Sequence, residues 1–267
     1  DVYKRQEYMY QHLLEYYNAT ILSATQIKEG WMKHIYSNED APYNENYLWV
    51  SNERAYYLMM DGIEPPLTSE PGNNPYFSMI DAQLTTEIFG LFSPGRADIA
   101  LELAYLPIRT TAKYDAEWIS NFYVTMHSLA SSVSDTLTMN EKILWLSNEA
   151  RKELPDSSYS AKMYDFVKTS YHKGKKWEET RDELNLKYQI RQEDNYLWST
   201  KDKSCNGCFA AGINFGASII SLLYGEGDIK ETIKIGALAG WDSDNPCLLY
   251  TSDAADEGLG VDLGGRR

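Results

Sequence analysis

The stretch GCFAAGINFGASIISLLYGEGDIKETIKIGALA, from Gly207 to Ala239, carries the clearest fold signal in the chain. Its first part, up to Leu223, is rich in apolar side chains at spacings of three and four residues, the period of a helix. A turn with Gly225 and Gly227 follows, and Asp228 is placed to cap a second helix that ends near Ala239. The stretch therefore predicts two consecutive helices.

The same three- and four-residue period recurs along the rest of the chain, and no segment shows a sustained alternation of apolar and polar residues. We find no repeat of solenoid length and no low-complexity tract, which favours one compact bundle over a helical array. The sequence thus predicts an all-α fold in a single domain over residues 7–246. The expected helices are Glu7–Tyr17, Thr25–Tyr36, Asn52–Met60, Ile80–Phe92, Ala97–Tyr105, Asp115–Ser131, Asn140–Glu153, Tyr159–Tyr171, Trp177–Tyr188, Gly207–Leu223 and Ile229–Ala239.

Local signals support this division of the chain. Ser23 lies ahead of Gln26 as in a capping box, and Asp81 precedes an apolar run. The segment Asp61–Pro75 contains four prolines, two glycines and two asparagines, so it cannot continue a helix. We expect it to form a long surface loop of the kind that shapes a ligand cleft.

Composition excludes several classes of protein. A hydrophobic fraction of 43%, with 21 Tyr and 7 Trp, is typical of a packed globular protein. The net charge of -14 disfavours binding to a nucleic-acid backbone. The longest apolar stretches are too short to span a bilayer, so we expect no membrane partner.

The chain has three cysteines, which say little about its compartment. Cys205 and Cys208 form a CxxC motif, and such a pair can bind zinc or exchange disulfides. No second CxxC and no neighbouring pair of histidines accompanies it. We therefore interpret these cysteines as small buried residues at a helix start and not as zinc ligands.

Two aspartates follow the last predicted helix in the run GWDSDNP, residues 240–246. Asp242 and Asp244 stand two residues apart, which on a helix would separate their side chains by about 200° around the axis. They can converge on one ion only in a loop, which Gly240 and Pro246 favour. Their carboxylates suit Mg²⁺, Mn²⁺ or Ca²⁺, although such a site needs further carboxylates. The alternative is a capped helix or a solvated turn.

The residues around these aspartates resemble the ADP-ribosylglycohydrolase family. That family has a C-terminal metal motif of Gly, one variable residue and Asp-x-Asp followed by Thr, Cys or Asn, and the run from Gly240 to Asn245 fits it. The resemblance extends over nearly all of residues 7–246, through the segments Asp81–Gly90, Pro94–Gly95, Cys205–Cys208, Ile213–Phe215 and Tyr224–Asp228.

The resemblance implies a compact all-α fold that binds two Mg²⁺ (or Mn²⁺) ions at the bottom of a cleft. It also implies hydrolysis of an N- or O-glycosidic ADP-ribosyl bond, with an ADP-ribosylated protein or a small ADP-ribosyl compound as the substrate. Such chemistry is sensible, because divalent ions can fix ribose hydroxyls and activate water. The metal ligands implied in this chain are Asp242, Asp244 and Asn245.

The family's remaining ligands and its catalytic acidic residue belong to an acidic cluster near the N-terminus. The residues from Glu7 to Tyr10 resemble the helix that follows this cluster, so the cluster falls upstream of Glu7 and no catalytic residue is assigned here. We accordingly expect this copy to bind metal weakly and to catalyse poorly.

Substrate contacts are expected from the polar run that begins at Asp81 and from two tryptophans. A polar run that opens a helix offers donors and a favourable dipole to an anionic group, although an ordinary capped helix explains it equally well. Trp49 and Trp241 can stack on an adenine or a ribose, whereas core packing is the default for such side chains. The expected substrate-binding residues are Asp81, Gln83, Thr85, Trp49 and Trp241, with Thr86 and Glu87 in the same run.

The chain departs from the family at two places. Family members often carry a His after a Thr where Thr110 and Thr111 stand, and Asp81-Ala82 replaces an Asn-Gly pair of the phosphate-contacting segment. These differences leave the identity of the substrate open.

The C-terminal run from Cys247 to Arg267 has no helical or strand period. DVYKRQ at residues 1–6 and CLLYTSDAADEGLGVDLGGRR at residues 247–267 resemble translated sequencing-adapter read-through. We interpret both as non-native tails on a partial domain, the alternative being natural flexible termini.

Two other functions fit the sequence. The chain can be a noncatalytic relative that binds ADP-ribose or a nucleoside, because enzyme folds can persist after the chemistry is lost. It can also be a structural helical protein, in which Asp242 and Asp244 only cap a helix.

Overall fold

The structure is a computed structural model that describes residues 2–36, 48, 50–196 and 207–243. The regular elements within these ranges are helices, which confirms the predicted all-α class. The longer helices are α1 (Val2–Tyr17), α2 (Ala24–His34), α3 (Val50–Met60), α4 (Ile88–Phe92), α5 (Ala97–Ile108), α6 (Asp115–Ala130), α7 (Met139–Ala150), α8 (Tyr159–His172), α9 (Trp177–Leu184), α10 (Ala211–Tyr224) and α11 (Ile229–Ala239). Short 3₁₀ or π turns connect them: η2 (Leu67–Ser69), η3 (Asp81–Leu84), η4 (Arg151–Glu153), η5 (Asn185–Ile190) and η6 (Glu193–Asn195).

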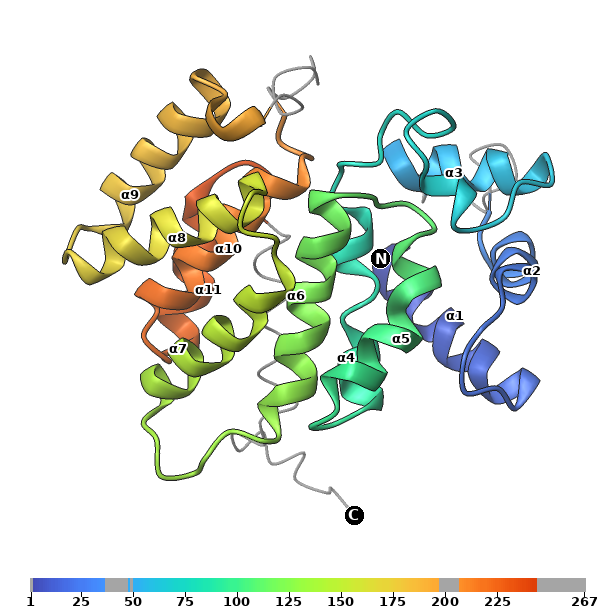
Figure 1. Cartoon of the computed structure of the whole chain (residues 1–267), viewed down its shortest axis with the longest axis horizontal. Helices are drawn as coiled ribbons and strands as arrows, with labels where there is room; N and C mark the ends of the chain where they lie inside the picture. Colours follow the sequence, from blue (N-terminus) through green and yellow to red (C-terminus); the bar gives the residue numbers. More distant parts are fainter. Residues whose placement is uncertain (1, 37–47, 49, 197–206, 244–267) are drawn as a thin grey trace.

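Helix α6 runs through the middle of the molecule. In Figure 1, α1 to α5 lie on one side of it and α7 to α11 on the other. Helix α6 packs against α4 and α5 on the first side and against α7 and α10 on the second. Helix α10 also packs against α8 and α11, so the core of the second half is built around α10.

Aromatic side chains join these central helices. Phe122 of α6 meets Phe215 of α10 with the ring centroids 5.0 Å apart, and the two rings are nearly perpendicular. Phe122 also contacts Tyr164 of α8 at 5.8 Å. All three side chains are fully buried. Perpendicular aromatic pairs add stabilisation beyond the burial of apolar area, so this cluster fixes how the three helices cross.

The predicted helix starts at Ser23 and Asp228 are confirmed. The Ser23 hydroxyl accepts a hydrogen bond from the Gln26 amide, and the Gln26 side chain accepts one from the Ser23 amide, which makes a complete capping box. The Asp228 carboxylate accepts a hydrogen bond from the Glu231 amide at 2.9 Å at the start of α11. These starts are specified within three residues of sequence, which is why the pattern revealed them.

The predicted helix Ile80–Phe92 is wrong. The chain instead forms η3, leaves helical geometry around Thr85, and begins again as α4 at Ile88. The Thr85 hydroxyl donates to the Asp81 carbonyl at 3.0 Å, and the Thr86 hydroxyl donates to the Ala82 carbonyl at 2.7 Å. Two consecutive β-branched residues have a low helix propensity, and their hydroxyls satisfy carbonyls at the point where the helix stops.

The segment Asp61–Pro75 has no long helix, as predicted, but it is more firmly held than a plain surface loop. Thr68, Ser69 and Asn74 are buried. The buried guanidinium of Arg109 donates to the Ser69 hydroxyl at 3.1 Å and to the Glu70 carboxylate at 2.7 Å. Charge-assisted hydrogen bonds of this kind are roughly twice as strong as neutral ones, so they hold the segment against the end of α5.

Gly90 allows a close approach between α4 and α6. A Cβ added at Gly90 would lie 2.4 Å from the Val124 carbonyl oxygen and 2.6 Å from the His127 Cβ. We predict that Gly90→Ala destabilises the protein by about 1–3 kcal/mol, because overpacking against backbone outweighs the gain in helix propensity. Urea unfolding measures this change. Gly72→Ala is the control, since a Cβ there meets nothing within 4 Å, and equal effects of the two substitutions would refute the close approach.

Gln6 of α1 is buried, and neither polar atom of its side-chain amide has a hydrogen-bond partner in the described part of the chain. A buried amide without partners costs about 1–3 kcal/mol. We predict that Gln6→Met, which keeps the length of the side chain, raises the free energy of unfolding by an amount in that range. Gln11→Met on the exposed face of the same helix should change it little. A destabilised Gln6→Met variant in urea melts would contradict the prediction.

Candidate functional site

The chain turns sharply where α11 ends. Gly240 has a φ of 99° and Trp241 a φ of 58°, both in the left-handed region. A glycine at the first of these positions is favourable, because it has no Cβ to clash. The turn brings the chain back onto α10, where the Asp242 amide donates a hydrogen bond to Asn214 Oδ1 at 3.2 Å. Asp242 itself is half-buried, while Asp244 and Asn245 lie outside the described residues.

Asn214 connects this turn to the start of α10. Its side chain is fully buried. Its amide nitrogen donates to the Cys208 carbonyl at 2.5 Å and to the Ala210 carbonyl at 3.0 Å. The Asn214 amide therefore joins two backbone segments that are about thirty residues apart in sequence. The sequence interpretation used Asn214 only as part of the family resemblance, although a lone amide inside an apolar helix was a signal of such a role.

A third segment lies against the start of α10. The Ile80 amide donates to the Phe209 carbonyl at 3.1 Å, and the Ala211 amide donates to the Ser78 carbonyl at 2.9 Å. Met79 and Ala210 accordingly form an isolated antiparallel bridge. This extended pairing explains why α10 begins at Ala211 and not at Gly207 as predicted. It also brings the polar run that begins at Asp81 to the same end of α10 as the turn after α11.

Asp81 is turned toward the first turn of α3. Its buried carboxylate accepts a short hydrogen bond from the Ser51 hydroxyl. Burial raises the pKa of Asp81 to about 6, although the hydrogen bonds from Ser51 and from nearby backbone amides act in the opposite direction. The contact between Asp81 and Ser51 spans thirty residues and was not visible in the sequence. Its geometry gives Asp81 a structural role at α3, and its expected contact with substrate stays a prediction.

The other residues of this run are also buried. Gln83, Thr85, Thr86 and Glu87 are each at most 4% exposed. The two threonine hydroxyls bond to backbone carbonyls of η3, and Glu87 lies near Tyr123 of α6, whose pKa is raised by burial and by the Glu87 charge. The run thus forms η3 and the link between η3 and α4, and it does not open one continuous helix as we expected. The substrate-binding assignments of Gln83 and Thr85 stay predictions.

Of the two tryptophans expected to bind the substrate, only Trp241 lies among the described residues. Trp241 is half-buried and packs against the main hydrophobic core, directly before Asp242. Trp49 lies outside the described residues.

Cys208 is buried, as expected, and it takes part in a disulfide bond, which the sequence interpretation did not foresee.

The described residues do not by themselves form a metal site. Within them no group of three or more His, Cys, Asp or Glu side chains could hold one ion. Of the three expected ligands, Asp242 is the described one, and a carboxylate oxygen is a ligand that Mg²⁺ prefers. The structure therefore places one expected ligand and leaves the complete set as a prediction.

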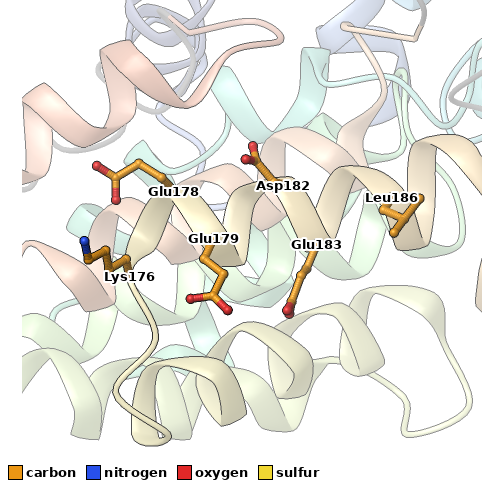
Figure 2. A pocket seen from close by; sticks show the side chains of 6 residues that line it. All are labelled: Lys176, Glu178, Glu179, Asp182, Glu183 and Leu186. Atoms are coloured by element: carbon orange, nitrogen blue, oxygen red, sulfur yellow. The ribbon is translucent and has the colours of Figure 1, made fainter.

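An open hollow of about 590 Å³ lies along α9. Figure 2 shows Glu178 and Asp182 pointing to one side of the helix and Glu179 and Glu183 to the other. Glu183 accepts hydrogen bonds from Lys175, and Asp182 pairs with Arg181. Cations of the same chain thus partly neutralise these acids. We interpret the hollow as a solvated face of α9, and none of the expected site residues lines it.

Comparisons with models of protein families, with curated proteins and with solved structures find no match for this chain. Among the helices of the described ranges, none combines the length and the apolar character needed to cross a bilayer.

Because the pKa of Asp81 is raised in the folded protein, we predict that the free energy of unfolding depends on pH through this residue. A carboxyl whose folded pKa lies above its unfolded value favours folding while protonated, so its contribution is complete below about pH 4 and is lost as the pH rises through about 6. We expect Asp81→Asn, which keeps an acceptor for Ser51, to remove this dependence. The unfolding free energy of the parent protein should fall relative to that of the variant by about 2 kcal/mol between pH 4 and pH 7.

Urea unfolding at several pH values measures this difference. Asp98→Asn is the control, because the exposed Asp98 pairs with Arg96 and its pKa is lowered, which gives a dependence of opposite sign. Parallel curves for the parent and Asp81→Asn would show that Asp81 is not titrating in this range.

Proposed function

We propose that this chain is the helical body of a Mg²⁺-dependent (or Mn²⁺-dependent) ADP-ribosylglycohydrolase-like enzyme. In this proposal Asp242, Asp244 and Asn245 are metal ligands. The substrate is an ADP-ribosylated protein or a small ADP-ribosyl compound, joined by an N- or O-glycosidic bond. The observation that carries the proposal is the attachment of the turn after α11 to the start of α10, beside the segment that leads to Asp81.

This attachment supports the proposal because it concerns the run expected to hold the metal and the segment that leads to the run expected to contact the substrate. The Asp-x-Asp run and the polar run from Asp81 are more than one hundred and fifty residues apart. Hydrogen bonds nevertheless tie Asp242, and Ser78 and Ile80 directly before Asp81, to residues 209–214. A metal-bearing loop and a substrate-contacting segment must lie close together in a hydrolase of this type, since the ion acts on the bound sugar.

Asp242 suits its proposed role through its place in the chain. Its backbone is fixed by the bond to Asn214, and its carboxylate follows a positive-φ turn that stops α11. A ligand held on a constrained turn loses less conformational entropy when it binds an ion. When bound, divalent ions would orient ribose hydroxyls and lower the pKa of a water molecule for attack on the anomeric carbon.

The proposal needs acidic residues beyond the described ones. We place the remaining ligands and the catalytic acid in a segment upstream of Glu7 in the uninterrupted reading frame, as the family resemblance implies. Further support is electrostatic: the chain carries a net charge of -14, and divalent cations offset the repulsion of an anionic ADP-ribosyl group.

A noncatalytic ADP-ribose-binding or structural protein is the second candidate. It is favoured by the internal hydrogen bonds of Asp81, Thr85 and Thr86, which leave their side chains buried and engaged within the fold. A binding protein of this kind would be indifferent to the loss of Asp242.

The test uses the full-length protein, expressed from a reading frame in which the two adapter-like tails are replaced by the natural sequence; we call this the uninterrupted reading frame. We expect Asp242→Ala and Asp244→Ala each to abolish the Mg²⁺-dependent release of ADP-ribose while the circular dichroism spectrum and melting temperature in EDTA stay unchanged. The physical reason is the loss of a carboxylate oxygen that, in this proposal, binds the ion directly. Glu178→Ala, an acid removed from the hollow along α9, is the control and should keep full activity.

Unchanged release in both aspartate variants would overturn the metal assignment. Mg²⁺-independent binding of ADP-ribose without hydrolysis by the parent protein would favour the noncatalytic candidate.

A further inference from the structure

Asn214 is a polar residue in a helix that lies wholly inside the protein. Every residue of α10 from Ala211 to Leu223 is buried. A buried amide is costly unless its donors and its acceptor are all used, and Asn214 uses both kinds of group. Ser221, on the same helix and equally buried, instead donates to the Ala217 carbonyl four residues earlier. A buried polar side chain in a helix can thus be satisfied by one bond within that helix, whereas Asn214 also bonds to backbone outside α10.

The orientation of the Asn214 amide follows from its partners. The carbonyl oxygens of Cys208 and Ala210 can only accept, so they face the amide nitrogen. The Asp242 N–H can only donate, so it faces Oδ1. A flipped amide would lose all three interactions, and a side chain held in this way has one productive position.

These bonds continue into the segment that leads to Asp81. The Cys208 and Ala210 carbonyls flank Phe209, whose own carbonyl accepts from the Ile80 amide. The pairing of Ala211 with Ser78 closes this connection on the other side of Ala210. Hydrogen bonds and the intervening backbone of residues 208–211 therefore connect the Asp242 backbone through Asn214 to residues 78–80. Such a connection transmits position when each group in it is fully bonded.

We propose that Asn214 is a positioning residue that holds the Asp242 turn at a fixed place relative to the segment 78–81. Its effect on metal binding rests on the proposed function, whereas the pinning of the turn does not. Asn214 touches neither the ion nor the substrate in this scheme. It acts through its hydrogen bond to the Asp242 backbone, which fixes the position of the Asp242 main chain and thereby of the carboxylate attached to it.

The proposal predicts a specific pattern of loss. Residues that orient a metal ligand without touching the ion typically change metal affinity by about 10- to 100-fold when they are replaced. Loss of Asn214 should therefore raise the Mg²⁺ concentration needed for half-maximal effect by about this factor. Saturating Mg²⁺ should restore much of kcat, because the ligands themselves are intact. A residue with a purely structural role would lower the melting temperature without altering the dependence on Mg²⁺.

Asn214→Ser is the most informative variant. A serine at this position can donate to the Ala210 carbonyl four residues earlier, as Ser221 does to Ala217, so α10 keeps an internal bond. The shorter side chain cannot reach the Asp242 amide. Asn214→Leu removes every bond at similar volume and serves as the stronger variant if it folds. Ser221→Ala is the matched control, a buried polar group lost from the same helix.

Two measurements are made on the protein from the uninterrupted reading frame. Hydrogen exchange followed by mass spectrometry, in EDTA, reports on the amides of residues 240–243. Titration with Mg²⁺, followed by thermal shift and by ADP-ribose release, reports on metal affinity and on kcat at saturation. We expect Asn214→Ser to speed exchange in the turn and to raise the Mg²⁺ requirement, while Ser221→Ala leaves both within about twofold of the parent, as for a site with no shared partner.

The outcomes separate this proposal from the proposed function. Unchanged exchange in Asn214→Ser would overturn the pinning of the turn. Faster exchange with an unchanged Mg²⁺ requirement would overturn the effect on the metal site. A parent protein with no response to Mg²⁺ would overturn the proposed function and the metal consequence with it, and the exchange result would still decide whether Asn214 pins the turn.

Discussion

The structure depends on one helix that has no solvent-exposed face. Helix α10 is buried along its whole length from Ala211 to Leu223, and its neighbours α6, α8 and α11 are placed by their contacts with it. A helix surrounded in this way must be apolar on every side or must satisfy its polar groups internally. Small residues make this possible, because a Cβ at Gly212 would lie 2.6 Å from ring carbons of both Tyr159 and Tyr196. Close packing around α10 thus requires glycine where neighbouring side chains meet the helix.

The same constraint determines where polar groups can be used. Within α10 the buried serine Ser221 bonds back to its own helix, which is the least demanding solution. Asn214, one turn from the N-terminus of the helix, instead bonds to backbone outside it. The first turn of a helix and the chain that precedes it carry backbone groups with no partner inside the helix, so long-range connections concentrate there. The candidate site lies at this end because it is the part of α10 that can bond to other segments.

Residues that act on their near neighbours could be predicted from the sequence. The cap at Asp228 and the capping box at Ser23 involve partners three residues away, and the helical periods of the central segments are local as well. The break at Thr85 was missed because the apolar spacing of Ile80–Phe92 outweighed the two threonines in the pattern. The start of α10 was misplaced because the extended pairing with residues 78–80 comes from a distant part of the chain.

At the candidate site, too, local features could be predicted from the sequence and long-range contacts could not. The motif around Asp242 identified a turn, and the turn is present. What holds the turn could not be read from the motif, since Asn214 lies 28 residues away and reaches it only when α10 and α11 pack together. The carboxylate of Asp81 was expected to contact the substrate, yet it is bonded to Ser51 at the start of α3 and buried. A sequence pattern can propose which side chains have suitable chemistry. Whether a given carboxylate faces a ligand or another helix is decided by tertiary packing, because the cost of burying a charge depends on the partners that packing supplies.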